Sequence, residues 1–120
     1  MTEIRYLVDE NTLHAIGDQL RRREPKIVIL TVGDELGPPR GSSDPEILLW
    51  LERQEYCLIT RNRHSIPEHL RHHLAAGHHV PGIFTLRPRA PVGQIIDALL
   101  LIWAASKPGE YTDQVVYIPF

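Results

Sequence analysis

The sequence predicts an α/β protein with three layers, in which a mostly parallel central sheet of about five strands lies between helices. Short apolar runs rich in β-branched residues alternate along the chain with longer segments whose apolar residues recur at helical spacing. The connections between them are short, which favours right-handed crossovers and therefore parallel strands. A chain of 120 residues fits a single domain, residues 1–120.

The first strand is expected in the apolar run that begins at Tyr6 and stops at Asp9, Glu10 and Asn11. An apolar run that ends in two carboxylates and an amide is typical of a buried strand that delivers polar side chains to the carboxyl edge of a sheet, where open α/β folds bind ligands. The competing interpretation is that Asp9 or Asn11 only turns the chain and caps the next helix.

The next elements follow from periodicity and from their boundaries. Residues 12–23 should form an amphipathic helix with Leu13, Ile16 and Leu20 on its inner face, ended by Pro25. Residues 26–32 predict a strand covered on both faces, and residues 33–43 a long loop beside the sheet. A capping box at Ser43 and Glu46 then predicts a helix that runs to about residue 54.

The second half of the chain repeats this alternation. A third strand at 56–60 ends in the polar segment 61–64, and a second capping box, Ser65 with Glu68, opens a helix that ends at Gly77. A fourth strand follows at 82–86. The helix expected at 92–105 is apolar around most of its circumference, which predicts deep burial or a partner surface such as a homodimer contact. Residues 115–118 should form a fifth strand at an edge, because Pro119 follows.

Composition narrows the class of protein. The 13 basic and 15 acidic residues give a net charge of −2, which excludes a global attraction to nucleic acid or to an anionic membrane. The single cysteine, Cys57, lies in an apolar run and is expected to be a buried thiol in a reducing compartment, which points to the cytoplasm. The longest apolar run, 95–105, contains Asp97 and is too short for a membrane span.

Three carboxylates are expected to meet at the carboxyl edge of the sheet. Strands one and three can lie side by side, which brings Asp9 and Glu10 next to the segment 60–64, and Asp44 in the first turn of its helix can point to the same place. Such carboxylates would repel one another without a hard cation, so they predict a Mg²⁺ or Mn²⁺ site able to activate water against a phosphodiester. The alternative for Asp44 is a purely structural one, in which it stabilises the helix dipole.

Two other groups of residues have weaker implications. Seven arginines could neutralise phosphates along one face, or could simply be solvated surface: Arg21, Arg22, Arg23, Arg40, Arg61, Arg63 and Arg71. Six of the seven histidines lie between His64 and His79, and His69 and His73 have the spacing of a zinc-binding pair on a helix. Solvated helix histidines are the more common explanation for such a cluster.

The chain resembles the PIN-like proteins related to bacterial VapC toxins, in the compact subgroup whose first strand ends in Leu-x-Asp-Glu-Asn. The resemblance covers most of the chain through four segments in order: Leu7 to Asn11, Ser43 to Glu46, Leu58 to His64, and Pro81 to Pro88. It implies a Mg²⁺-dependent or Mn²⁺-dependent ribonuclease that acts on RNA and is paired, as a toxin, with an antitoxin protein. Asp9 and Asp44 match the first two acidic positions of the family's metal site and would be catalytic.

The resemblance fails at one place. Where the family usually has Thr-x-Asp-x-Asp, this chain has Thr60-Arg61-Asn62-Arg63-His64, so two carboxylates are replaced by an amide and an imidazole. The expected metal ligands are therefore Asp9, Glu10, Asp44 and the carbonyl oxygen of Asn62, in a site weakened by lost negative charge. The residues expected to contact substrate are Asn11, Thr60, Arg61, Arg63 and His64.

Two alternatives remain beside the nuclease. One is a catalytically degenerate PIN-like module that binds RNA or a protein partner without cutting. The other is a phosphoacceptor receiver domain, which also has an acidic pair after its first strand. That class needs an aspartate at the end of strand three and a lysine after strand five, whereas this chain has Thr60-Arg61-Asn62 and places Lys107 at a helix end.

Overall fold

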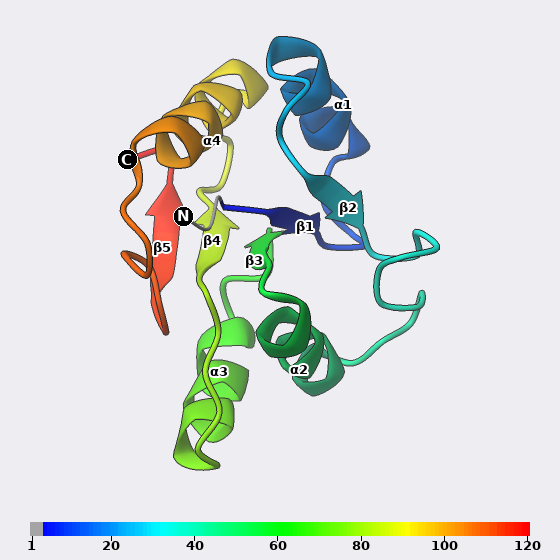
Figure 1. The fold of residues 1–120 in the computed structure, drawn as a ribbon, viewed down its shortest axis with the longest axis vertical. Helices are drawn as coiled ribbons and strands as arrows, with labels where there is room; N and C mark the ends of the chain where they lie inside the picture. The colour runs from blue at the N-terminus through cyan, green and yellow to red at the C-terminus, as the bar shows by residue number, and fades with distance from the viewer. Residues whose placement is uncertain (1–3) are drawn as a thin grey trace.

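Five short apolar runs form one parallel sheet in the computed structural model, which describes residues 4–120 (Figure 1). The strands are β1 (Tyr6–Val8), β2 (Ile29–Thr31), β3 (Cys57–Thr60), β4 (Ile83–Leu86) and β5 (Val115–Ile118). They lie in the order β2-β1-β3-β4-β5, and each neighbouring pair is parallel. The predicted sheet is confirmed, and β5 lies at an edge as expected.

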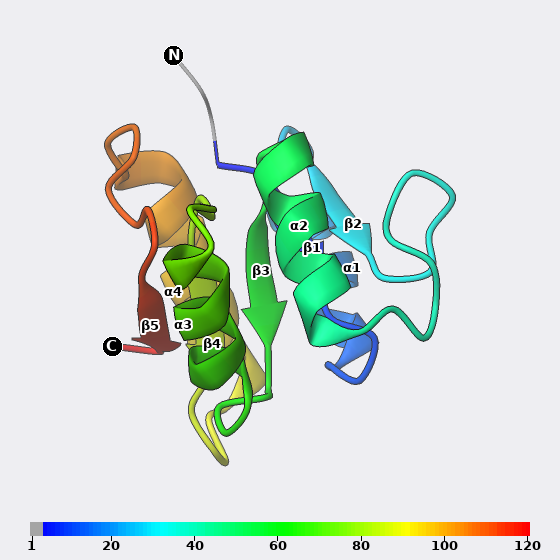
Figure 2. The ribbon, with the colours of Figure 1, turned by 90° about the horizontal axis from the view of Figure 1, so that it is seen from below.

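Two pairs of helices cover the two faces of this sheet, which confirms the three-layer architecture (Figure 1). The helices are α1 (His14–Arg23), α2 (Asp44–Gln54), α3 (Ile66–Ala75) and α4 (Val92–Ala105). Helices α1 and α4 share one core with Tyr6 and Val8, while α2 and α3 share the other with Leu7. This division follows from the alternation of side chains along a strand. Figure 2 shows α2 and α3 side by side along the sheet.

The strand order places a crevice at the carboxyl ends of β1 and β3. The chain leaves β1 through α1 on one face to reach β2, and returns through α2 on the other face to reach β3. The connections that follow β1 and β3 therefore diverge to opposite faces of the sheet. Open α/β sheets bind ligands at this kind of point, because the diverging loops leave a gap above the strands. Asp9 follows β1, and Thr60 ends β3.

The helix that begins after Ser43 has the predicted capping box. The Ser43 hydroxyl accepts a hydrogen bond from Glu46 N, and Glu46 Oε1 accepts one from Ser43 N at 2.9 Å. The second predicted box is wrong. Ser65 has a helical backbone conformation and makes no side-chain cap, and Glu68 pairs with Arg71 and His72 instead.

Three further predictions of position need correction. Helix α1 begins at His14, so Leu13 precedes it and is 44% exposed rather than part of its inner face. Strand β2 is shorter than predicted and is the other edge of the sheet; Leu30 and Thr31 are only partly buried, and Val28 just before the strand is exposed. Helix α4 does not bury nearly all its circumference, since Leu101 is 59% exposed.

Two predictions from composition can be compared with the structure. Cys57 is buried, as expected, and burial raises the pKa of its thiol to about 12. Across residues 4–120, none of the helices combines the length and the apolar character that crossing a bilayer requires.

Candidate functional site

Asp9 is fixed at the end of β1 by hydrogen bonds to both of its carboxylate oxygens. Oδ1 accepts the Glu10 N–H at 2.8 Å, and Oδ2 accepts the Thr60 hydroxyl at 2.7 Å. The Thr60 hydroxyl in turn accepts the Asn62 N–H at 3.0 Å. Because Thr60 is fully buried and its hydroxyl is engaged twice, its function in this geometry is to orient Asp9.

Glu10 connects the sheet to the long loop of residues 33–43. Its Oε1 accepts the Gly41 N–H at 2.8 Å, although the two residues are 31 positions apart in the chain. Gly41 has a φ of +78°, a conformation that favours glycine. The contact brings the end of the loop over the carboxyl edge of β1, directly before the helix that carries Asp44.

Asp44 lies in the first turn of α2 and meets side chains from the segment after β3. Its Oδ2 accepts hydrogen bonds from Asn62 Nδ2 at 3.2 Å and from the Ser65 hydroxyl at 3.3 Å. The same oxygen lies 3.6 Å from Nε2 of His69 on α3. The helix dipole favours a carboxylate at this position, so the structural interpretation of Asp44 also holds.

Asn62 directs its nitrogen, and not its carbonyl oxygen, towards Asp44. Its Oδ1 accepts the backbone N–H groups of Ser65 at 3.1 Å and His64 at 3.3 Å, while Nδ2 donates to Asp44 and to the Ser65 hydroxyl at 2.6 Å. Two backbone donors on one side and two acceptors on the other define the orientation of the amide. Asn62 therefore holds the turn that leads into α3 and would lose both backbone hydrogen bonds if Oδ1 bound a metal.

One cavity of about 370 Å³ lies between these residues. Thr12, at its wall, is 4% exposed, and its hydroxyl has no hydrogen-bond partner among residues 4–120. A buried hydroxyl without a partner is costly, which is consistent with a polar occupant of the cavity. The lining residues are Asp9, Glu10, Asn11, Thr12, Gly41, Ser42, Asp44, Ile47, Thr60, Arg61 and Asn62.

The carboxylates of this cavity are of the chemical type that a hard cation binds. Asp9, Glu10 and Asp44 supply carboxylate oxygens, and each carboxylate has about four lone-pair sites, more than the hydrogen bonds described above occupy. Carboxylates together with water are the ligands that Mg²⁺ and Mn²⁺ select. Of the four predicted ligands, the three carboxylates remain candidates and the Asn62 carbonyl oxygen does not, although in this structure the three carboxylates do not all come within 4.8 Å of one another.

The other predicted contact residues divide into two groups. Asn11, Thr60 and Arg61 line the cavity, whereas Arg63 and His64 are exposed and do not line it. Of the seven arginines, Arg61 is the one at the cavity wall, and two of those at the end of α1 are engaged elsewhere: Arg21 donates to the Ile29 carbonyl and Arg23 pairs with Asp97. A continuous basic face is not assembled at this cavity.

Sequence reasoning missed Ser65 and His69 as neighbours of Asp44. A signal for them was present. Helix α3 starts directly after the polar end of β3. Side chains four residues apart, such as those of Ser65 and His69, lie on one face of a helix and point back towards its N-terminus, so both could be expected near that polar end. The interpretation of the clustered histidines as solvated was wrong for His73. Its side chain is only 5% exposed and lies beside Glu52.

Comparisons with protein-family models, with curated proteins and with solved structures give no significant match for this chain. The resemblance to PIN-like proteins therefore rests on the four sequence segments given above.

Proposed function

We propose that the chain is a Mg²⁺-dependent or Mn²⁺-dependent ribonuclease with Asp9, Glu10 and Asp44 as its metal ligands. One observation carries the proposal: three carboxylates from two distant segments line a single cavity at the carboxyl edge of the sheet. Hydrogen bonds from Thr60 to Asp9 and from Asn62 to Asp44 hold two of them in place, so the site is organised before any ligand binds.

Each residue has a defined task in this proposal. Asp9 and Asp44 would bind the cation and position it against a phosphodiester, and Glu10 would add a third charge while it holds Gly41. Arg61 is the cation at the cavity wall available to a phosphate oxygen. The bound ion would supply the acidity that activates water and would stabilise the developing negative charge.

The position of Asn62 favours a second function, that of a degenerate module which binds RNA or a protein without cleavage. An amide nitrogen 3.2 Å from Asp44 already stabilises part of the negative charge that a cation would otherwise balance. Because Mg²⁺ affinity depends on the number of charged ligands, a site with this amide binds the ion more weakly than one with a carboxylate.

A cleavage assay separates the two functions. The full chain is incubated with end-labelled single-stranded RNA in Mg²⁺, in Mn²⁺ or in EDTA. We expect cleavage that requires the metal and that falls by about 100-fold or more in Asp9→Asn and Asp44→Asn, since even residues that only support metal ligands cost about 10–100-fold. Asparagine keeps the size of the side chain and can still accept the Thr60 or Ser65 hydroxyl.

The matched control is Asp97→Asn, an exposed carboxylate on α4 that pairs with Arg23 and lies away from the cavity. This variant should cleave as wild type does. Cleavage that is equal in Asp9→Asn and wild type would show a contaminating nuclease. RNA binding without cleavage in either metal would instead favour the degenerate module.

We further propose that the partner in the cell is an antitoxin protein, an inference that rests on the resemblance alone. Induced expression of wild type should arrest bacterial growth, and expression of Asp9→Asn should not. Co-expression of a small DNA-binding protein encoded beside this chain should restore growth. Arrest by both variants would oppose the toxin proposal and leave the cleavage assay unaffected.

A further inference from the structure

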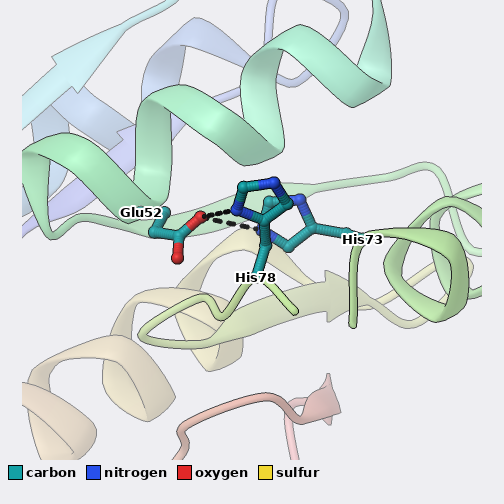
Figure 3. Close-up of side chains that lie close together, drawn as sticks. All are labelled: Glu52, His73 and His78. Carbon is teal, nitrogen blue, oxygen red and sulfur yellow. Dashed lines mark ion pairs between the residues drawn. The ribbon is translucent and has the colours of Figure 1, made fainter. Parts of the chain in front are cut away.

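A second cluster of metal-binding side chains lies where helices α2 and α3 end (Figure 3). Glu52 comes from the last turns of α2, His73 from the last turn of α3, and His78 from the loop before β4. Their side chains converge although they come from three segments. Glu52 Oε1 lies 2.9 Å from His78 Nδ1 and 3.5 Å from His73 Nε2, and all three ligand atoms lie within 4.8 Å of one another.

We propose that Glu52, His73 and His78 bind a Zn²⁺ ion that fastens α2, α3 and the loop before β4 to one another. Two imidazoles and one carboxylate form a recognised zinc ligand set, with a fourth position for water. Ligand atoms about 2.0–2.1 Å from a tetrahedral ion are roughly 3.3 Å apart, and the two contacts of Glu52 lie on either side of that value. The site shares no ligand with the carboxylate cavity, and its proposal does not rest on the proposed nuclease.

The electrostatics at this position favour a cation. Helices α2 and α3 both direct their C-terminal ends here, and the negative ends of two helix dipoles attract positive charge. The hydrogen bond from His79 N to Glu52 Oε2, 3.1 Å long, and secondarily the neighbouring imidazoles lower the pKa of Glu52. Glu52 is therefore a carboxylate at neutral pH, in the form that ligates a metal.

The loop that carries His78 is anchored directly after that residue. Asp113 accepts hydrogen bonds from His79 Nδ1 at 2.7 Å and from Val80 N at 2.9 Å. Such outer contacts orient the ligands of a metal and contribute to its affinity. His78 itself remains half exposed and its ring stacks on that of His73, so a rotation of this side chain would complete the geometry.

Binding of Zn²⁺ would replace the hydrogen bond between His73 and the His79 carbonyl oxygen. Nε2 of His73 lies 3.1 Å from the His79 carbonyl oxygen, and a metal bound at Nε2 would require the ring proton to be on Nδ1 instead. Access is available from outside, because Glu52 and His79 also line a cavity of about 490 Å³ at the opposite end of the sheet from Asp9.

Titration of ZnCl₂ into the full chain by calorimetry tests the proposal. We expect wild type to bind Zn²⁺ in a step that is at least about tenfold weaker in His78→Gln and in Glu52→Gln. The matched control is His72→Gln, which removes an exposed histidine of the same helix that pairs with Glu68. It should bind as wild type does. Asp9→Asn should also bind Zn²⁺ normally, because it alters only the distant cavity.

A second measurement reports on geometry. Co²⁺ in place of Zn²⁺ should give the intense visible absorption of a tetrahedral site in wild type and in His72→Gln, but not in His78→Gln. Added Zn²⁺ should raise the melting temperature of wild type and not of His78→Gln, whose half-exposed side chain can be replaced without loss of the fold. Equal Zn²⁺ affinity in His78→Gln and His72→Gln, or no binding to wild type, would overturn the proposal.

Discussion

The side-chain nitrogen of Asn62 lies 3.2 Å from Oδ2 of Asp44, at a position where the PIN-like proteins that the sequence resembles usually have a carboxylate. The oxygen of the same side chain accepts the backbone N–H of Ser65, in the turn before α3. Asn62 thus joins the segment after β3 to the start of α2 without a metal.

Asn62→Asp should make the fold depend on a divalent cation. An aspartate can still accept the backbone N–H of Ser65, but its second oxygen would face Asp44 at a distance where two carboxylates repel. We expect a loss of about 1–3 kcal/mol in the free energy of unfolding at neutral pH in EDTA, largely recovered in Mg²⁺ or Mn²⁺. Urea denaturation in the two buffers measures both values.

The control for this variant is His64→Asp, which adds a carboxylate at an exposed residue outside the cavity lining. This variant should change the free energy of unfolding little, and its stability should not depend on a divalent cation. If Asn62→Asp is as stable in EDTA as in Mg²⁺, the two carboxylates do not share a cation.

Thr60→Val should destabilise the fold and disturb Asp9. Valine has nearly the same shape, but it removes the hydroxyl that donates to Asp9 and accepts from Asn62 N. We expect a cost of about 1–3 kcal/mol in chemical denaturation, because two polar groups lose their partner in a partly buried site.

Thr85→Val is a close control, since Thr85 is the register partner of Thr60 on β4 and is equally buried. Its hydroxyl makes only a long contact of 3.5 Å with the Val116 carbonyl. The Thr85 variant should therefore lose less stability. An equal loss in the two variants would mean that the cost comes from the strand position and not from the bond to Asp9.

Ser43→Ala should weaken α2 and raise the pKa of Glu46. The Ser43 N–H and then the Ser43 hydroxyl lower the pKa of Glu46 from its usual 4.5. A carboxylate with a lowered folded pKa stabilises the fold above its unfolded pKa, and this stabilisation is lost as the pH falls through the folded value. The variant should lose about 1 kcal/mol near pH 7 and depend less on pH below 4.5.

Denaturation between pH 3 and 7, at roughly unit steps, and NMR titration of Glu46 measure these effects. Ser42→Ala is the neighbouring control, because its hydroxyl donates to the Pro39 carbonyl and not to Glu46. An unchanged Glu46 pKa in Ser43→Ala would show that the backbone N–H alone is responsible for the shift.

Leu99→Ala and Leu101→Ala should differ sharply although the residues are two positions apart on α4. Leu99 is fully buried, and its removal leaves a cavity that costs about 2–5 kcal/mol. Leu101 is 59% exposed, so its variant should stay within about 0.5 kcal/mol of wild type. Thermal and urea denaturation of both variants provide the comparison. A large loss for Leu101→Ala would indicate that this side chain is covered in solution, as a homodimer through α4 would require.

The sequence predicted the architecture because each strand and helix carries its own local signal. Buried runs such as Tyr6 to Val8 and the capping box at Ser43 depend on nearby residues alone. The meeting of Asp9 and Asp44 at one cavity also followed, since parallel strands share a carboxyl edge. The orientation of the Asn62 amide did not follow, because it depends on Ser65 and on Asp44, 18 residues away. The contact between His73 and Glu52 did not follow either, because the two residues belong to different helices.

His69 and His73, one helical turn apart on α3, divide their contacts between the two ends of α2. His69 reaches Asp44 in the first turn of α2, and His73 reaches Glu52 near its last turn. A slide of one helix along the other therefore alters both carboxylate contacts at once. Thermodynamic linkage then requires reciprocity: if Zn²⁺ at Glu52 changes the affinity for Mn²⁺ at Asp44 by some factor, Mn²⁺ must change the affinity for Zn²⁺ by the same factor. The contact between α2 and α3 would in that case couple the binding of the two metal ions.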